Sequence, residues 1–247
     1  MSMTTLEMVE NTLKAIKKYS LINPWENYNP MQYILSVDQQ KIDSFEIPII
    51  QDKIMWKSTD KYKFEDQFPV PVNGNFLKAK YLLLYSNPGT EENDLNKSSV
   101  LNSNLSVKES LIRCFNLDLN SKLVIPSNNP QWEKWYIGEL DKFFTHPKVD
   151  IANFNIHTFL DDFCFINLLA YPTISNEFDF TKDELKQLHD LPSTKFAKEL
   201  VKIGMEAKKE IIVIRRSEGV WKHSADDTYL FDKLSSHYQK ATKSNLL

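Results

Sequence analysis

Three short apolar runs divide the chain. They cover residues 79–85, 163–169 and 210–215, and each has the length of a β-strand. Almost continuous apolar runs of this length are typical of strands that are buried on both faces, as in a parallel sheet. Amphipathic stretches lie between the runs, and strand, helix and strand in this order favour right-handed crossovers. The pattern therefore predicts an α/β fold.

Apolar residues at helical spacing, together with N-cap and proline signals, predict helices around these strands. The first helix covers residues 5–19, and its apolar positions are Leu6, Val9, Leu13 and Ile16. The others are a helix opened by Asn29-Pro30, one over residues 106–116, one opened by Asn129-Pro130, and one with Ser193 as its N-cap. Residues 41–76 lack a clear period and contain several prolines, which predicts an extended approach to the sheet.

Composition limits the classes of protein that fit. The 247 residues include 30 basic and 33 acidic ones, a net charge of −3, so no global positive field attracts nucleic acid. Cys114 and Cys164 stand in apolar contexts without the spacing of metal ligands, so neither a zinc site nor a disulfide framework is expected. No apolar run reaches the roughly 18 residues of a membrane span, and the N-terminus lacks a signal-peptide core. We expect a cytoplasmic protein without metal or cofactor.

The first apolar run ends at Asn87-Pro88-Gly89, which predicts a tight elbow. Pro88 fixes its own φ and favours extended geometry for Asn87, while Gly89 can adopt a positive φ and lets a ligand approach the backbone. Loops at the carboxyl ends of strands are where α/β sheets bind ligands. The alternative is that Asn-Pro-Gly is an ordinary turn signal.

Polar residues mark the ends of all three runs. Asn87 follows the first run, Asn167 lies within the second, and Arg215 and Arg216 follow the third strand. Because the carboxyl ends of parallel strands meet at one edge of a sheet, we expect these side chains to line one cleft.

The order of three motifs resembles the uracil-DNA glycosylase superfamily. Asn-Pro-Gly follows the first long strand, Phe-Ile-Asn-Leu-Leu lies on a middle strand, and Ile-Ile-Val-Ile-Arg-Arg-Ser precedes a tryptophan. The resemblance is nearest to poorly characterised bacterial members. It implies a three-layer α/β/α domain over residues 71–247, with a central, mostly parallel sheet of about four strands. Residues 1–70 would then form an N-terminal helical and extended segment packed on this core.

In that superfamily the first loop carries an Asp or Asn that positions the water which attacks the sugar, and Asn87 matches the Asn form. An amide cannot accept the proton of that water, so the resemblance implies slow hydrolysis in which Asn87 only orients the nucleophile. Asn167 matches a position where some members recognise uracil, and a carboxamide suits a pyrimidine edge. Tyr171 offers a ring for stacking on a base.

Each of these residues also has a structural interpretation. Asn87 can cap its own loop, Asn167 can satisfy the backbone of a neighbouring loop, and Tyr171 can pack in the core. The expected site has Asn87 as its catalytic residue, and its substrate-binding residues are Tyr85, Ser86, Pro88, Gly89, Asn167, Tyr171, Arg215, Arg216 and Ser217.

The chain also departs from the family pattern. The second family motif, a His-Pro-Ser stretch that stabilises the leaving group, is missing, and the nearest candidates are His237 and residues 241–245. Tyr85 stands where the family prefers glycine, so its ring either crowds a base pocket or forms one of its walls.

Residues 195–221 hold seven basic and four acidic side chains, and Lys240 and Lys243 add charge in the tail. Such a local basic patch predicts contacts with a few phosphates of DNA or another nucleic acid. The alternative is an ordinary solvated helix face.

Three functions follow from these features. The first is a DNA-repair hydrolase of the uracil-DNA glycosylase superfamily. Its candidate activity is that of a DNA N-glycosylase, and the sequence does not decide between an enzyme and an inactive relative. The second is an inactive module that binds nucleic acid or a nucleotide-like ligand. The third is a protein-interaction role for the aromatic helix around Trp132 and Trp135.

Overall fold

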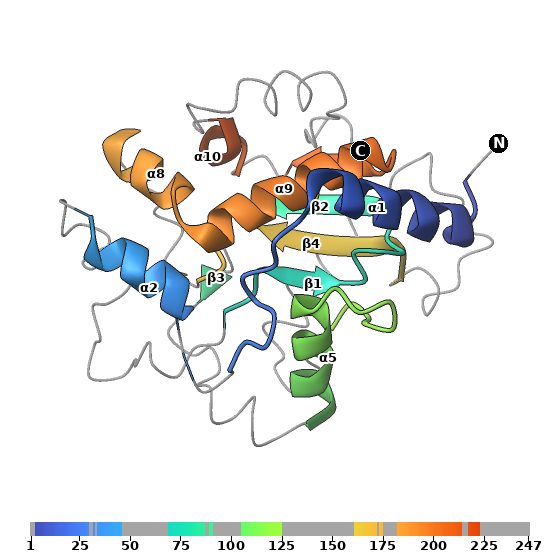
Figure 1. Ribbon diagram of the computed structural model, residues 1–247, viewed down its shortest axis with the longest axis horizontal. Coiled ribbons are helices and arrows are strands. Elements are labelled where there is room, and N and C mark those ends of the chain that lie inside the picture. The colour runs from blue at the N-terminus through green and yellow to red at the C-terminus, as the bar shows by residue number, and fades with distance from the viewer. Residues whose placement is uncertain are drawn as a thin grey trace.

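A four-stranded sheet with the strand order β1-β4-β2-β6 forms the centre of the computed structural model (Figure 1). The structure describes residues 3–29, 32, 34–45, 69–86, 89–90, 105–124, 161–171, 173–174, 182–213 and 217–222. The strands of this sheet are β1 (Val72–Gly74), β2 (Tyr81–Tyr85), β4 (Phe163–Asn167) and β6 (Glu210–Val213). Two further short strands, β3 (Gly89–Thr90) and β5 (Thr173–Ile174), pair with each other.

The sheet is mostly parallel. Strand β2 pairs in parallel with both β4 and β6, and only β1 runs antiparallel, along the free edge of β4. The three predicted strands and the general α/β class are therefore confirmed. Strand β1 was expected only as an extended approach, because Gly74 and the prolines that precede the strand, Pro69 and Pro71, hide the strand pattern. Gly74 has φ +115°, and a Cβ there would lie 2.4 Å from the carbonyl oxygen of Phe163, so the close pairing with β4 requires glycine.

Six helices are described. They are α1 (Thr5–Tyr19), α2 (Ser36–Asp43), α5 (Leu105–Phe115), α8 (Lys182–His189), α9 (Pro192–Glu206) and α10 (Glu218–Lys222). Helices 5–19 and 106–116 are confirmed, the second within one residue. The helix expected from Asn29-Pro30 is wrong in its start, because α2 begins at Ser36 with Leu35 as its N-cap. The helix opened by Asn129-Pro130 lies outside the described residues.

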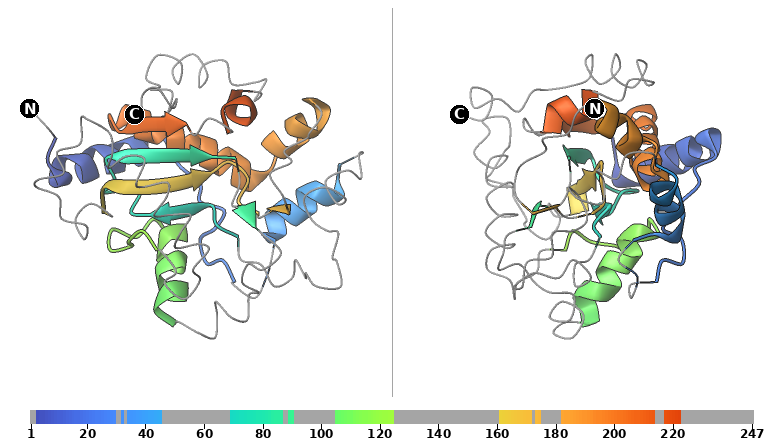
Figure 2. Two further views of the ribbon diagram at one scale, coloured as in Figure 1. Left: turned by 180° about the vertical axis from the view of Figure 1, so that it is seen from behind. Right: turned by 90° about the vertical axis from the view of Figure 1, so that its left-hand side faces the viewer.

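Helix α9 lies directly on one face of the sheet, and α1 lies on α9 (Figure 2). Gly204 of α9 brings the helix close to β2, because a Cβ at this position would meet the Leu82 side chain at 2.3 Å. Lys18 of α1 forms an ion pair with Glu206 of α9 at 2.8 Å. The side chains of Leu82 and Leu84 on this face belong to the main apolar core.

The opposite face of the sheet is aromatic. Tyr81 stacks on Phe163 and Tyr85 stacks on Phe165, with ring centroids 5.0 and 5.5 Å apart. Because side chains alternate along a strand, these rings point away from α9. Leu83 between them is fully buried, so both faces of the sheet are covered, as the continuous apolar runs predict.

Helix α1 is rotated from the orientation that its leucines suggest. Met8, Thr12 and Ala15 are buried, whereas Leu6 and Leu13 are 69% and 46% exposed. The Thr12 hydroxyl donates to the carbonyl oxygen of Met8 at 2.7 Å, so this small polar side chain is satisfied inside the core. Small residues on the buried side allow a close approach of α1 to the core, and this packing outweighs the burial of the leucines.

The described part of residues 1–45 packs on the same core as the sheet. The fully buried ring of Trp25 lies 5.4 Å from the ring of Phe115 and 6.2 Å from that of Tyr171. The Asn23 side chain donates to the carbonyl oxygen of Phe115 at 2.7 Å. Helices α1 and α2 and the segment between them therefore share one apolar core with the strands.

The amino end of the sheet holds a buried lysine. Nζ of Lys209 donates to the carbonyl oxygens of Leu77 and Ala79 at 3.3 and 2.7 Å. Burial lowers the pKa of Lys209 to about 7. Lys209 was counted in the basic surface patch of residues 195–221, and this assignment is wrong, because its ammonium group lies inside the protein and satisfies backbone carbonyls. Cys114 and Cys164 are also buried as free thiols.

Candidate functional site at the carboxyl end of the sheet

Three parallel strands end together on one side of the sheet. Tyr85, the last residue of β2, pairs with Asn167, the last residue of β4, and Leu84 pairs with Val213 at the end of β6. The segments that follow these strands therefore start at the same edge. We call this edge, formed by Tyr85, Ser86, Asn167 and Ser217, the carboxyl rim. Parallel α/β sheets bind their ligands at such an edge.

Hydrogen bonds join the segments after β2 and β6. The backbone N–H of Ser86 donates to Oγ of Ser217 at 2.8 Å. The indole N–H of Trp221 in α10 donates to the carbonyl oxygen of Tyr85 at 3.1 Å. Ser217, which was expected to bind substrate, therefore uses its hydroxyl to hold the backbone directly before Asn87. Trp221 completes this clamp and was not selected from the sequence, where it served only to mark a motif.

The segments after β2 and β4 also lie side by side. The backbone N–H groups of Leu168 and Leu169 donate to the carbonyl oxygens of Tyr85 and Ser86, at 2.9 and 2.8 Å. Further on, Gly89 in β3 pairs in parallel with Thr173 in β5. The chain is thus bound to the segment after β4 both before Asn87, through Tyr85 and Ser86, and after Pro88, through Gly89. Asn87 and Pro88 themselves lie outside the described residues, as do Arg215 and Arg216.

Asn167 lies at the rim, and its side chain is engaged within the protein. Nδ2 donates to the carbonyl oxygen of Val70 at 2.6 Å, and the backbone N–H donates to that of Pro71 at 3.0 Å. The amide thus fixes the chain just before β1 against the end of β4. The position of Asn167 at the end of β4 is the one expected from the parallel strands, and the hydrogen bond to Val70 corresponds to the structural interpretation of the same residue.

Tyr171 lies in the core. Its ring is buried near Trp25, and its hydroxyl donates to Oδ2 of Asp38 at 2.6 Å and accepts from the backbone N–H of Leu35 at 3.2 Å. These contacts correspond to the packing interpretation of Tyr171. In this arrangement the ring has no exposed face for a base. Tyr85 is also buried, with its ring stacked on Phe165.

Asp38 of α2 connects the rim to the helix layer. Its carboxylate accepts from Tyr171 and, through Oδ1, from the backbone N–H of Ser193 at 3.0 Å. Burial raises the pKa of Asp38, although the hydrogen bonds from Ser193 and Tyr171 oppose this rise. The prediction of Ser193 as the N-cap of α9 is wrong. Leu191 occupies the N-cap without a side-chain bond, and Asp38 caps the first turn from another helix.

Asp38 could not be selected from the sequence, because a single aspartate in a short polar helix is usually exposed. The signal that was available lies elsewhere. Leu191 before Pro192 leaves the first turn of a 15-residue helix without a capping side chain, and such a turn requires a partner from outside.

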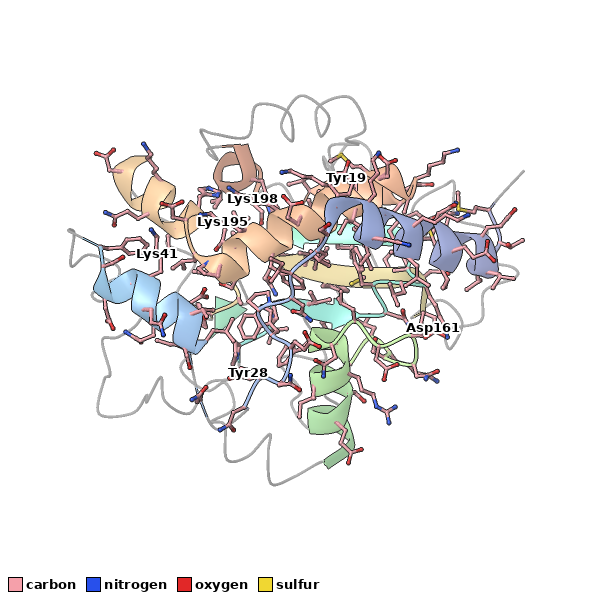
Figure 3. The ribbon with its side chains drawn as sticks, viewed as in Figure 1. Tyr19, Tyr28, Lys41, Asp161, Lys195 and Lys198 are labelled. Atoms are coloured by element: carbon pink, nitrogen blue, oxygen red, sulfur yellow. The ribbon has the colours of Figure 1, made fainter. Side chains whose placement is uncertain are left out.

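Positive charge gathers near this end of the molecule. Lys41 of α2 and Lys195 of α9 both approach the carboxylate of Asp190, at 3.8 and 3.0 Å. Figure 3 places Lys198 beside them on α9. In the part of the chain that the structure describes, no group of three or more His, Cys, Asp or Glu side chains has the arrangement of a metal site.

None of the described helices is long and apolar enough to cross a membrane. No family model, curated protein or solved structure matches this chain.

Proposed function

We propose that this protein binds DNA at the carboxyl rim and slowly hydrolyses a base–sugar bond there, as a metal-independent member of the uracil-DNA glycosylase superfamily. The pairing of Tyr85 with Asn167 at the ends of two adjacent parallel strands is the observation that carries the proposal. This pairing supports a single site for the Asn-Pro-Gly and Phe-Ile-Asn-Leu-Leu motifs, whose asparagines are 80 residues apart in the sequence. A three-layer α/β/α arrangement of residues 71–247 is part of the same proposal.

The chemistry assigns a limited task to each residue. Asn87 would orient a water molecule toward the anomeric carbon of the sugar. The water oxygen forms a bond to that carbon, the carbon–nitrogen bond to the base breaks, and the base leaves with the bonding electrons. An amide cannot accept the proton of the water, so that proton goes to solvent and the reaction depends on oxocarbenium character. Slow turnover follows, because Asn87 cannot act as a general base and the sequence has no His-Pro-Ser motif.

The clamp after β2 supports this task. A positioned water contributes to the rate only when the group that holds it is itself fixed. The bond from Ser86 to Ser217 and the bond from Trp221 to Tyr85 fix the backbone immediately before Asn87. In this proposal Ser217 and Trp221 are positioning residues, and they act through the backbone of the elbow.

Single-turnover base release tests the proposal. Purified protein in excess is incubated for hours with oligonucleotides that contain uracil or a mismatched base, and abasic sites are counted after cleavage in alkali. We expect slow release by the wild type and none by Asn87→Ala. Asn116→Ala is the matched control, because this exposed asparagine follows α5 near the amino end of the sheet and should leave the rate unchanged. Release at the wild-type rate by Asn87→Ala, or no release by any protein, contradicts the hydrolase.

A second candidate is a binding module without chemistry. The observation that favours it is the internal use of the Asn167 amide, whose donor is bound to the carbonyl oxygen of Val70. An amide that is engaged in this way has less to offer a base. Binding of the same oligonucleotides without base release would support this candidate. The protein-interaction role stays a prediction, since Trp132 and Trp135 lie outside the described residues.

A further inference from the structure

Two lysines from distant parts of the chain share one exposed carboxylate beside the carboxyl rim. Nζ of Lys195 lies 3.0 Å from Oδ1 of Asp190, and Nζ of Lys41 lies 3.8 Å from Oδ2. Lys195 begins the second turn of α9, whereas Lys41 belongs to α2, more than 150 residues earlier. All three side chains are substantially exposed, at 39% for Lys41, 58% for Lys195 and 51% for Asp190.

Lys198 extends this group by one helical turn. It lies near enough to act on Asp190, since hydrogen bonding by Lys195 and the charges of Lys195, Lys41 and Lys198 together lower the pKa of the Asp190 carboxyl. The next acid on α9, Glu199, pairs with Lys202 at 2.9 Å. We call Lys41, Lys195, Lys198 and Asp190 the α2–α9 lysine cluster. It brings three ammonium groups together around one carboxylate.

Buried hydrogen bonds connect the helix turn before the cluster to the segment that follows β4. Ser193, two residues before Lys195, donates to Asp38, which accepts from Tyr171 in the segment after β4. Asp38 in turn lies three residues before Lys41 on the same helix. Figures 1 and 3 show α2 and the start of α9 beyond the end of the sheet to which β4 points, with the three lysines side by side. A strand of DNA that enters the rim would pass this surface.

We propose that the α2–α9 lysine cluster holds backbone phosphates of DNA whose base is bound at the rim, and that Asp190 occupies the place of a phosphate when DNA is absent. This inference rests on the proposed binding of DNA. The ammonium groups of Lys41 and Lys195 converge on the two oxygens of one carboxylate, so their spacing suits another compact anion such as a phosphate. When a phosphate arrives, Asp190 must give up its two ion pairs to solvent, so the same carboxylate weakens binding.

The cluster differs from the basic patch that the sequence suggests. Lys41 lies far outside residues 195–221, and Lys209 within that range is buried. The cluster therefore joins one helix turn of α9 to a lysine from the N-terminal segment. This gives residues 1–70 a role in binding as well as in packing.

The inference is tested by measuring binding of a labelled, uracil-containing single-stranded oligonucleotide at several NaCl concentrations between 20 and 200 mM, values chosen so that screening changes strongly. Lys41→Gln/Lys195→Gln should weaken binding at low salt and reduce the slope of log K against log salt by about 1.4, the value for two lost phosphate contacts on a single strand. Lys14→Gln/Lys17→Gln on α1 is the matched control, because it removes the same charge from another exposed surface. It should leave the slope within experimental error.

Asp190→Asn supplies a second, opposite test. It removes the competing carboxylate and should tighten binding several-fold, whereas Asp118→Asn, which removes the partner of Arg113 beside α5, should not. Equal effects of the test and control variants, an unchanged slope in the lysine double variant, or no binding by the wild type at 20 mM NaCl would overturn the inference. Stronger binding of the wild type to vesicles of anionic lipid than to the oligonucleotide would also overturn it.

The base-release assay separates this inference from the proposed function. If the wild type and Lys41→Gln/Lys195→Gln release the base at the same rate below saturating DNA, the role of the cluster is contradicted and the hydrolase is supported. Binding that depends on the cluster, without release by any protein, supports the cluster and contradicts the hydrolase.

Discussion

The backbone N–H of Ser86 and the hydroxyl of Ser217, 131 residues apart, are joined by a hydrogen bond of 2.8 Å. This bond connects the segment after β2 to the segment after β6. It is reinforced by the bond from the Trp221 indole to the carbonyl oxygen of Tyr85. Together the two bonds place α10 against the entrance to the Asn87-Pro88-Gly89 elbow, so the last described helix helps to set the backbone of the candidate site.

Replacement of Ser217 by alanine should destabilise the protein by about 1 kcal/mol, because the Ser86 N–H loses its acceptor in a partly buried position. Ser44→Ala is the control, since the Ser44 hydroxyl bonds a carbonyl oxygen at an exposed helix end. Urea unfolding followed by circular dichroism measures both. A loss no greater than that of Ser44→Ala would show that the Ser86–Ser217 bond does not hold the rim.

The strands of this fold could be predicted from the sequence because continuous apolar runs report burial on both faces directly. The edge strand β1 could not, since Gly74 and the neighbouring prolines conceal a strand whose stability comes from pairing with β4. The orientation of α1 was not predictable either. Leu6 and Leu13 dominate its apolar pattern, yet the side that carries Thr12 and Ala15 is the one that is buried.

The candidate site, like the fold, could be predicted only in part from the sequence. The location of Asn167 opposite Tyr85 follows from the parallel order of the strands, which the sequence indicates. The hydrogen-bond partners of Asn167, Tyr171 and Ser217 could not be predicted, because each bond joins residues that are far apart in the chain. Asp38 illustrates the limit most clearly, since its role depends on the meeting of α2, α9 and the segment after β4.

The stability contributed by Asp38 should fall as the pH rises. Burial raises the pKa of this carboxyl in the folded state above its unfolded value, so the folded protein binds a proton more readily in the window between the two pKa values. Relative to Asp38→Asn, the wild type should therefore lose stability from about pH 4 upward until the raised pKa is passed. Urea unfolding of both proteins between pH 4 and 8 measures the difference. A difference in unfolding free energy that is independent of pH would contradict the burial of a titrating carboxyl.

Lys209 should show the opposite dependence. Burial lowers its pKa to about 7, so the unfolded chain binds more protons than the folded protein between about pH 7 and the ordinary lysine pKa. Relative to Lys209→Met, the wild type should gain stability as the pH rises from 7 to 10, by an amount on the order of a few kcal/mol. Lys208→Met is the control, because it makes the same substitution at the exposed lysine next to Lys209. Equal pH profiles for the two variants would be evidence that Lys209 is solvated.

Gly204→Ala should destabilise the protein by about 1–3 kcal/mol, because the new methyl group meets Leu82 at 2.3 Å and pushes α9 away from β2. Removal of the clash by Leu82→Ala should make the double variant more stable than the sum of the two single losses indicates. Gly219→Ala in α10 is the control, since a Cβ there has no neighbour within 4 Å. Thermal unfolding of the four proteins measures the coupling, and strictly additive losses would contradict the contact between Gly204 and Leu82.

The central claim is that DNA binds at the carboxyl rim, and backbone amide NMR tests it most directly. A uracil-containing oligonucleotide is titrated into isotope-labelled protein, and the amide signals at the two ends of the sheet are compared. If DNA binds at the carboxyl rim, the amide signals of Ser86, Asn167 and Ser217 should shift and saturate together, while those of Lys80 and Glu210 at the amino end stay unchanged. Shifts that are confined to the amino end, or equal at both ends, would contradict it.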